Sequence, residues 1–174
     1  AMLAEPRKAY LLLNAEPELD CHDPHTAMKA MDAAEFVICL STYKGSAPDY
    51  ASALLPIAPF TETSGSFVNA EGRMQSFNGV VNPLGDARPA WKVLRVLGNL
   101  LGLAGFDYDS SEQVRDEIAK PDQLAGRLDN RLSGIALQTP AASAGLQRIA
   151  EVPIYAGDAI VRRAASLQQT RAAA

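Results

Sequence analysis

The sequence predicts an α/β fold: an open, mainly parallel sheet with flanking helices, a β-hairpin insertion and a C-terminal appendage of one strand and one helix. Three short apolar runs, over 10–13, 36–40 and 53–57, alternate with helical signals along the first third of the chain. An order of strand, helix and strand implies right-handed crossovers and a parallel sheet. A glycine-containing turn at 70–72, between two further strand-like runs, then predicts the hairpin.

The first two predicted elements are a buried strand and a helix. Tyr10-Leu11-Leu12-Leu13 is continuously apolar and ends at Asn14, which is typical of a strand buried on both faces. Asp23-Pro24 opens a helix, because the aspartate can accept a first-turn amide hydrogen bond and the proline needs no amide partner there. The buried stripe of this helix is Ala27, Met28 and Met31.

Two more apolar runs complete the predicted sheet. Phe36 to Leu40 reads as a second buried strand, and it contains Cys39. Ser46 to Ser52 follows as a short helical turn. Ala53 to Ile57 is the third strand, which ends where prolines interrupt the apolar pattern.

The middle of the chain predicts the hairpin and the longest helix. Ser66 to Asn69 and Arg73 to Phe77 flank a turn in which Gly72 supplies the positive φ angle. Asp86, with Pro89 in the first turn, is expected to start a helix that Gly102 ends. Its buried face would carry Trp91, Leu94, Leu97 and Leu101 and pack on the sheet.

We predict three regions in the chain. Residues 3–105 form the α/β domain. Residues 106–145 form an acidic helix, with Ser110 and Gln113 in capping-box positions, and an irregular linker over 120–145. Residues 146–174 form the C-terminal appendage.

The C-terminal appendage is predicted to contain a strand over 146–155 and a helix that Asp158 caps. The residues expected on the buried side of that helix are Ile160, Val161, Ala164 and Leu167.

Composition excludes several classes of function. The formal net charge of -4 disfavours a nucleic-acid surface, because such surfaces need a basic stripe. The chain has two cysteines, and Cys39 lies inside an apolar run, which favours a reducing, cytoplasmic compartment over a disulfide framework. It has no apolar stretch of about 20 residues, so we expect no direct insertion into a membrane. Any association with a membrane is expected to come through partners.

Cys21, His22 and His25, with Asp20 and Asp23, are possible metal ligands at the expected carboxyl end of the first strand. The cluster lacks the paired spacing of a structural zinc site. A polar turn between strand and helix explains the same residues.

The segment Thr42 to Ser46 could bind an anion or nucleotide, because it offers hydroxyls, Lys44 and backbone amides after a strand. The spacing is not that of a Walker loop, so an ordinary crossover loop is the competing interpretation.

Two other groups are candidate functional residues. Glu62 and Glu71 could form an acid/base pair, although hydrogen-bonded turn carboxylates fit them better. Arg162 and Arg163, with Asp158 beside Pro153-Ile154-Tyr155, could face a partner or lie on a solvated helix face. We assign no residue as catalytic, cofactor-binding or metal-binding.

A series of motifs resembles the molybdopterin-type oxidoreductase superfamily. Their order and spacing are specific, and they are Leu54-Leu55-Pro56, Glu62, Gly65-Ser66, Asn69, Glu71-Gly72-Arg73 and Gln75. Within that superfamily, residues 85–92 and the ending Pro153-Ile154-Tyr155 to Gln168 are similar to the large subunit of respiratory NADH-quinone oxidoreductase (complex I).

This resemblance implies a structural and assembly domain in the C-terminal part of that iron-sulfur subunit. The parent enzyme would pass electrons from NADH through iron-sulfur clusters to quinone. The clusters would be bound by an N-terminal part absent from this sequence, because a [4Fe-4S] cluster needs four cysteines. The implied partners are the remainder of the large subunit and other subunits of the peripheral arm, on the cytoplasmic side of the inner membrane.

Two alternatives stay open. One is a cofactor-binding fragment of an active molybdopterin enzyme, similar to a formate dehydrogenase, in which Thr42 to Ser46 would line a guanine-nucleotide pocket. This sequence departs from the family pattern at Ser52 and over 44–48, which argues against pterin binding. The other alternative is a metal-dependent enzyme that uses Cys21, His22 and His25.

Overall fold

A computed structural model describes residues 2–118, 124, 145–146 and 152–171. The chain divides into two compact units: residues 1–54 with 138–174, and residues 55–137. The irregular linker predicted over 120–145 lies almost entirely outside the described residues. None of the helices in the described ranges is both long enough and apolar enough to cross a bilayer.

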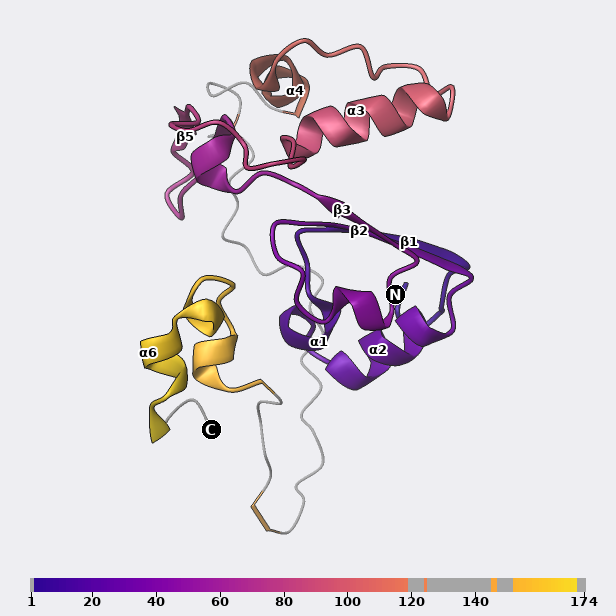
Figure 1. The fold of residues 1–174 in the computed structure, drawn as a ribbon, viewed down its shortest axis with the longest axis vertical. Helices are drawn as coiled ribbons and strands as arrows, with labels where there is room; N and C mark the ends of the chain where they lie inside the picture. The colour runs from indigo at the N-terminus through magenta and orange to yellow at the C-terminus, as the bar shows by residue number, and fades with distance from the viewer. Residues whose placement is uncertain (1, 119–123, 125–144, 147–151, 172–174) are drawn as a thin grey trace. The chain divides into compact units, whose positions relative to one another are not determined.

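A small parallel sheet is the centre of the first unit (Figure 1). It contains β1 (Ala9–Leu13), β2 (Phe36–Ser41) and β3 (Ala53–Pro56), in that order. β1 and β2 are parallel, with Ala9 opposite Phe36 and Leu13 opposite Leu40. The predicted α/β architecture with a parallel sheet is confirmed.

Short helices cover one face of this sheet (Figure 1). They are α1 (Pro17–Asp20) and α2 (Pro24–Asp32), and the 3-10 turn η1 (Ala47–Asp49) follows β2. α2 begins as predicted: the Asp23 carboxylate accepts hydrogen bonds from the amide and hydroxyl of Thr26, at 2.9 and 2.6 Å. Pro24 occupies the first turn of the helix.

The core of the first unit lies between β2 and α2. Val37 and Cys39 are 1% and 2% exposed, and Ala30 and Met31 of α2 are buried with them. Leu40, on the opposite face of β2, is 0% exposed. The burial of Cys39 agrees with the prediction from its apolar neighbours. The prediction that β1 is buried on both faces is wrong, because Leu11 and Leu13 are exposed. β1 is an edge strand with its helices on one face, so alternate side chains remain open to solvent.

The second unit contains the hairpin and the helices α3 and α4 (Figure 1). Its elements are η2 (Phe60–Glu62), β4 (Gly65–Val68), β5 (Met74–Phe77), α3 (Ala90–Leu100) and α4 (Ser111–Ile118). β4 and β5 pair antiparallel, and Gly72 has the predicted positive φ, 79°. The Phe67 and Phe77 rings stack across the hairpin with centroids 5.0 Å apart.

α3 starts later than the sequence predicted. The helix begins at Ala90, so Asp86 lies outside it, and Pro89 has an extended backbone with ψ of 130°. Arg88 precedes a proline, which disfavours helical geometry. Arg88 instead bridges to Ile57, and its carbonyl accepts from the Ala58 amide at 2.9 Å.

α4 has the predicted capping residues. The Gln113 amide donates to Ser110 Oγ at 3.3 Å, while Gln113 Oε1 accepts from the amide of Asp109 at 2.7 Å. In a usual capping box, the Gln113 side chain would accept from the amide of Ser110. Here it accepts from the amide one residue earlier in the chain.

The C-terminal segment, which we define as residues 152–171, is built from short turns. Its elements are η4 (Ile154–Ala156), η5 (Val161–Arg163) and α6 (Ala165–Gln168). Ile154–Ala156 is helical where the sequence predicted the end of a strand, and residues 147–151 lie outside the described residues. Asp158 Oδ1 accepts from the Ile160 and Val161 amides, both at 2.9 Å, but two short turns replace the single helix expected after it.

Leu40→Ala should lower the free energy of unfolding of the first unit by about 2–5 kcal/mol, because it leaves a cavity at a fully buried site. Urea denaturation followed by circular dichroism measures this. Leu13→Ala on the adjacent strand, where the side chain is 44% exposed, is the matched control and should cost clearly less. Equal losses for the two variants would contradict the full burial of Leu40.

The cap of α2 should make stability depend on pH. Hydrogen bonds from the Thr26 hydroxyl and amide hold the pKa of Asp23 below its ordinary value. The stabilisation is therefore present above the ordinary aspartate pKa of about 4 and lost as pH falls through the lowered value. Asp23→Ala should destabilise the protein in denaturant titrations at neutral pH and lose that effect in strong acid. Asp32→Ala, on the same helix, is the control, and a pH-independent effect of Asp23→Ala would contradict the assignment.

Candidate functional site

Two loops meet at the carboxyl edge of the sheet because β1 and β2 are parallel. Asn14 follows β1 with a φ of 49°, and its amide donates to the Leu40 carbonyl at 2.7 Å. The last residue of β2 and the five residues after it, 41–46, lie at this same edge, and we call them the edge loop. The sequence-predicted anion segment, Thr42 to Ser46, therefore lies where open parallel sheets place ligands.

The edge loop is held by internal hydrogen bonds and a glycine. Ser41 Oγ donates to the Tyr43 carbonyl at 2.7 Å and accepts from the Tyr43 amide at 3.1 Å. Gly45 has a φ of +48°, and a Cβ there would lie 2.6 Å from Glu16 Oε1. Backbone conformation and the nearby carboxylate therefore both favour glycine at this position.

The edge loop presents unused donors. Within the described residues, the amides of Lys44, Gly45 and Ser46 have no acceptor, and the exposed Lys44 ammonium makes no ion pair. Consecutive open amides beside a lysine are a donor set suited to a phosphate or another anion.

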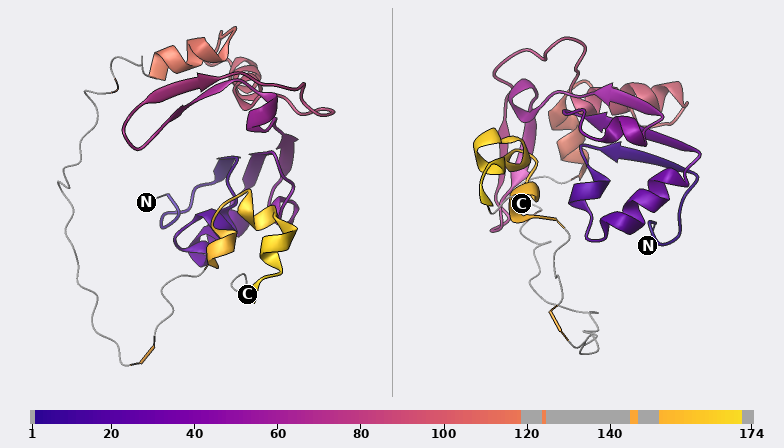
Figure 2. Two further views of the ribbon diagram at one scale, coloured as in Figure 1. Left: turned by 90° about the vertical axis from the view of Figure 1, so that its left-hand side faces the viewer. Right: turned by 60° about the horizontal axis from the view of Figure 1, so that its bottom comes forward.

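Four charged groups and one aromatic ring gather beside this loop. We call them the edge cluster: Glu16, Asp20, Tyr43, Arg162 and Arg163. The two arginines belong to the C-terminal segment, which lies beside the first part of the chain (Figure 2, left). Glu16 and Arg162 are 146 residues apart in sequence.

Arg162 is the most enclosed member of the edge cluster. Its guanidinium donates to Glu16 Oε2 and Asp20 Oδ1, both at 2.6 Å, and its side chain is 5% exposed. Burial alone would lower the pKa of Arg162, but the hydrogen bonds and negative charges of Asp20 and Glu16 raise it. Arg162 is therefore a charged group held by two carboxylates, and the interpretation that it lies on a solvated helix face is wrong.

Arg163 joins the C-terminal segment to the edge loop. Its guanidinium donates to Glu16 Oε1 at 2.6 Å, and its Cζ lies 3.8 Å from the centroid of the Tyr43 ring. This is the geometry of a cation–π contact. Both arginines thus bind residues of their own chain.

The structure does not assemble the predicted metal ligands. Cys21 follows α1, His22 is exposed, His25 lies in the first turn of α2, and Asp23 caps that helix. In the described part of the chain, no three histidine, cysteine or acidic side chains are placed to bind one metal ion. Burial, with the nearby charges of Asp20 and Glu18, raises the pKa of the Cys21 thiol, which disfavours the thiolate that metals bind.

Glu62 and Glu71 have structural positions. Glu62 Oε2 accepts from the Leu84 amide at 3.0 Å, which is the turn role expected for it. Glu71 lies in the hairpin turn, where its amide donates to Asn69 Oδ1 at 3.1 Å. These contacts form no acid/base pair.

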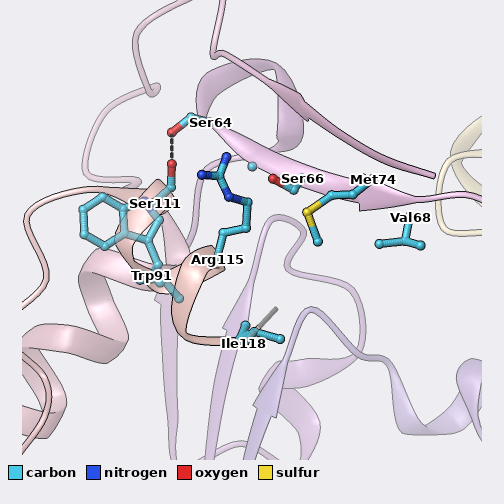
Figure 3. Close-up of a pocket in the computed structure, with 10 residues that line it drawn as sticks. Ser64, Ser66, Val68, Met74, Trp91, Ser111, Arg115 and Ile118 are labelled. Carbon is cyan, nitrogen blue, oxygen red and sulfur yellow. Dashed lines mark hydrogen bonds between the residues drawn. The ribbon is translucent and has the colours of Figure 1, made fainter. Parts of the chain in front are cut away.

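The second unit contains a separate pocket of about 350 Å³ between the hairpin and α4 (Figure 3). Apolar side chains of Val68, Met74, Trp91 and Val114 line it. The hydroxyls of Ser64 and Ser111 are 2.8 Å apart and bond to each other. Arg115 is bound to Asp116 and to Ser76 Oγ. The pocket therefore offers shape and apolar surface but little reactive chemistry.

Comparisons with known proteins place this geometry in a fold and a family. A protein of Staphylococcus aureus strain USA300, named "Putative formate dehydrogenase", is 33% identical over 113 residues, which cover 64% of this chain and 11% of that protein. A protein of Staphylococcus haemolyticus with the same type of name is 31% identical over 118 residues, covering 67% of this chain and 12% of that one. This chain thus spans about a tenth of the length of these relatives.

The fold is similar to that of acetylene hydratase from Pelobacter acetylenicus. The TM-score is 0.54 at 21% identity, over 62% of this chain and 15% of that one. Residues 1–100, which include the sheet and the edge loop, match the model of the Molybdopterin oxidoreductase family. The chain belongs to the molybdopterin oxidoreductase family.

Proposed function

We propose that this chain is a segment of a molybdopterin enzyme similar to formate dehydrogenases, and that the edge loop binds the anionic, nucleotide-bearing part of the cofactor. The observation that carries the proposal is the set of open donors at the carboxyl edge of a parallel sheet. The names of the relatives favour this interpretation over a subunit of complex I. Catalysis would belong to the complete polypeptide, of which the relatives' lengths suggest this is a small part.

The donor chemistry fits one part of such a cofactor. The amides of residues 44–46 and the Lys44 ammonium suit phosphate oxygens. The described residues offer no comparable ligand set for the metal. When bound, the molybdopterin group would supply the redox chemistry, while this chain would bind and orient its nucleotide end.

A second candidate is the structural domain of the complex I large subunit. The observation that favours it is the C-terminal segment, whose sequence resembles that subunit and whose arginines bind it to α1. In this interpretation the domain braces the peripheral arm on the cytoplasmic side of the membrane. Iron-sulfur clusters would be bound elsewhere in the subunit, and the partners would be the rest of the large subunit and neighbouring subunits.

The metal content of the complete polypeptide distinguishes the two candidates. A formate dehydrogenase-like enzyme should contain molybdenum or tungsten with a pterin, which elemental analysis and pterin fluorescence after acid release detect. Iron and acid-labile sulfide without either metal or a pterin would support the complex I subunit instead and would reject our first proposal.

Guanine nucleotide should bind to the 174-residue chain at the edge loop. In calorimetry with guanosine diphosphate, Lys44→Ala should weaken binding about tenfold, because a hydrogen bond to a charged group contributes about 1.5–3 kcal/mol. Lys92→Ala, which removes an exposed lysine stacked on Trp91 in the second unit, is the matched control and should bind like the wild type. Absence of heat with the wild type would reject the proposed contact and leave family membership intact.

A further inference from the structure

The C-terminal segment changes the charge of the carboxyl edge. Without it, Glu16 and Asp20 are two carboxylates beside a loop that has one ammonium, on Lys44. With it, Arg162 and Arg163 bind these carboxylates at 2.6 Å and offset their two negative charges. An anion approaching the edge loop therefore meets two fewer uncompensated negative charges in the second state than in the first.

This difference in charge acts close to the proposed anion site because of the position of Glu16. Its Oε1 atom lies 2.6 Å from where a Cβ on Gly45 would be, so the carboxylate is next to the amides that would receive an anion. Arg163 donates to that same oxygen and covers the face of Tyr43 in the edge loop. The Arg163 guanidinium therefore binds the Glu16 oxygen beside the loop amides, where an uncompensated negative charge would repel an anion most.

Polar contacts contribute to the attachment of the segment, while part of its apolar surface stays open. Ile154 and Ile160, two of its larger apolar side chains, are 78% and 60% exposed. Arg162 is 5% exposed and binds two carboxylates. Asp20 is 34% exposed and Arg163 23% exposed at the side chain, so water and salt reach the outer part of these contacts.

We propose that Arg162 and Arg163 form an electrostatic clamp that neutralises Glu16 and Asp20 and so makes the edge loop able to accept an anionic ligand. Docking of the C-terminal segment and binding of the anion then stabilise each other. The docked arginines remove negative charge that would repel the anion, and by linkage the bound anion favours the docked segment by the same free energy. This proposal rests on the proposed function, in which the edge loop binds the anion, whereas the ionic attachment of the segment does not.

Calorimetry with guanosine diphosphate on the full chain tests the coupling. Arg163→Gln should weaken binding about tenfold, within the usual range for coupled sites. Arg171→Gln removes the same charge from the same segment and is the matched control, because Arg171 is exposed and makes no ion pair among the described residues. Adding Glu16→Gln to Arg163→Gln should restore most of the affinity, because the repulsive charge is gone.

Hydrogen exchange provides a readout of the clamp that needs no nucleotide. Raising NaCl to about 1 M, where the screening length is about 3 Å, should increase exchange in residues 154–168, while residues 37–40 of the core stay protected. Arg162→Gln should cause the same increase at low salt.

The outcomes separate the two proposals. Binding of nucleotide that is unchanged by Arg163→Gln, or not rescued by Glu16→Gln, overturns the clamp and leaves the proposed function standing. Protection of 154–168 that responds to neither salt nor Arg162→Gln also overturns it. No nucleotide binding to any variant, with salt-sensitive protection of 154–168, rejects the nucleotide contact and the coupling together and leaves only the ionic attachment.

Discussion

The parallel pairing of β1 and β2 is the constraint on which the other features of the first unit depend. Leu13 lies opposite Leu40, so both strands end at one edge and the loops that follow them emerge together. Burial of Val37 and Cys39 against Ala30 and Met31 of α2 opposes a slip of the register, because a one-residue shift would move these side chains to the other face. The position of the edge loop beside Glu16 therefore follows from packing in the core.

The features that the sequence predicted well are local ones. The Asp23-Pro24 start of α2, the positive φ of Gly72 and the burial of Cys39 each depend on neighbours within a few residues. Short-range hydrogen bonds and steric limits act the same way in most tertiary contexts, so such signals are informative in a single sequence. The same holds for the parallel sheet, which follows from the order of its elements.

The features that the sequence did not predict depend on distant partners. The apolar run of β1 does not reveal that one face stays open, because its pattern is the same in edge and central strands. The ion pair of Glu16 with Arg162 spans 146 residues, and no local signal links them. An acidic residue just after a strand that leads to the carboxyl edge is a hint of such a contact, but it does not identify the partner.

The use of ion pairs to hold the C-terminal segment at the carboxyl edge of the sheet is informative about function. A segment that only had to attach to α1 would be held at least as well by apolar side chains, because charge burial costs desolvation that hydrophobic packing avoids. Ile154 and Ile160 are available in the same segment and remain exposed, while Arg162 is enclosed by Glu16 and Asp20. In our proposal, this arrangement sets the charge next to the edge loop. Such control matters for a surface that receives a charged ligand, whereas a purely structural brace would not require it.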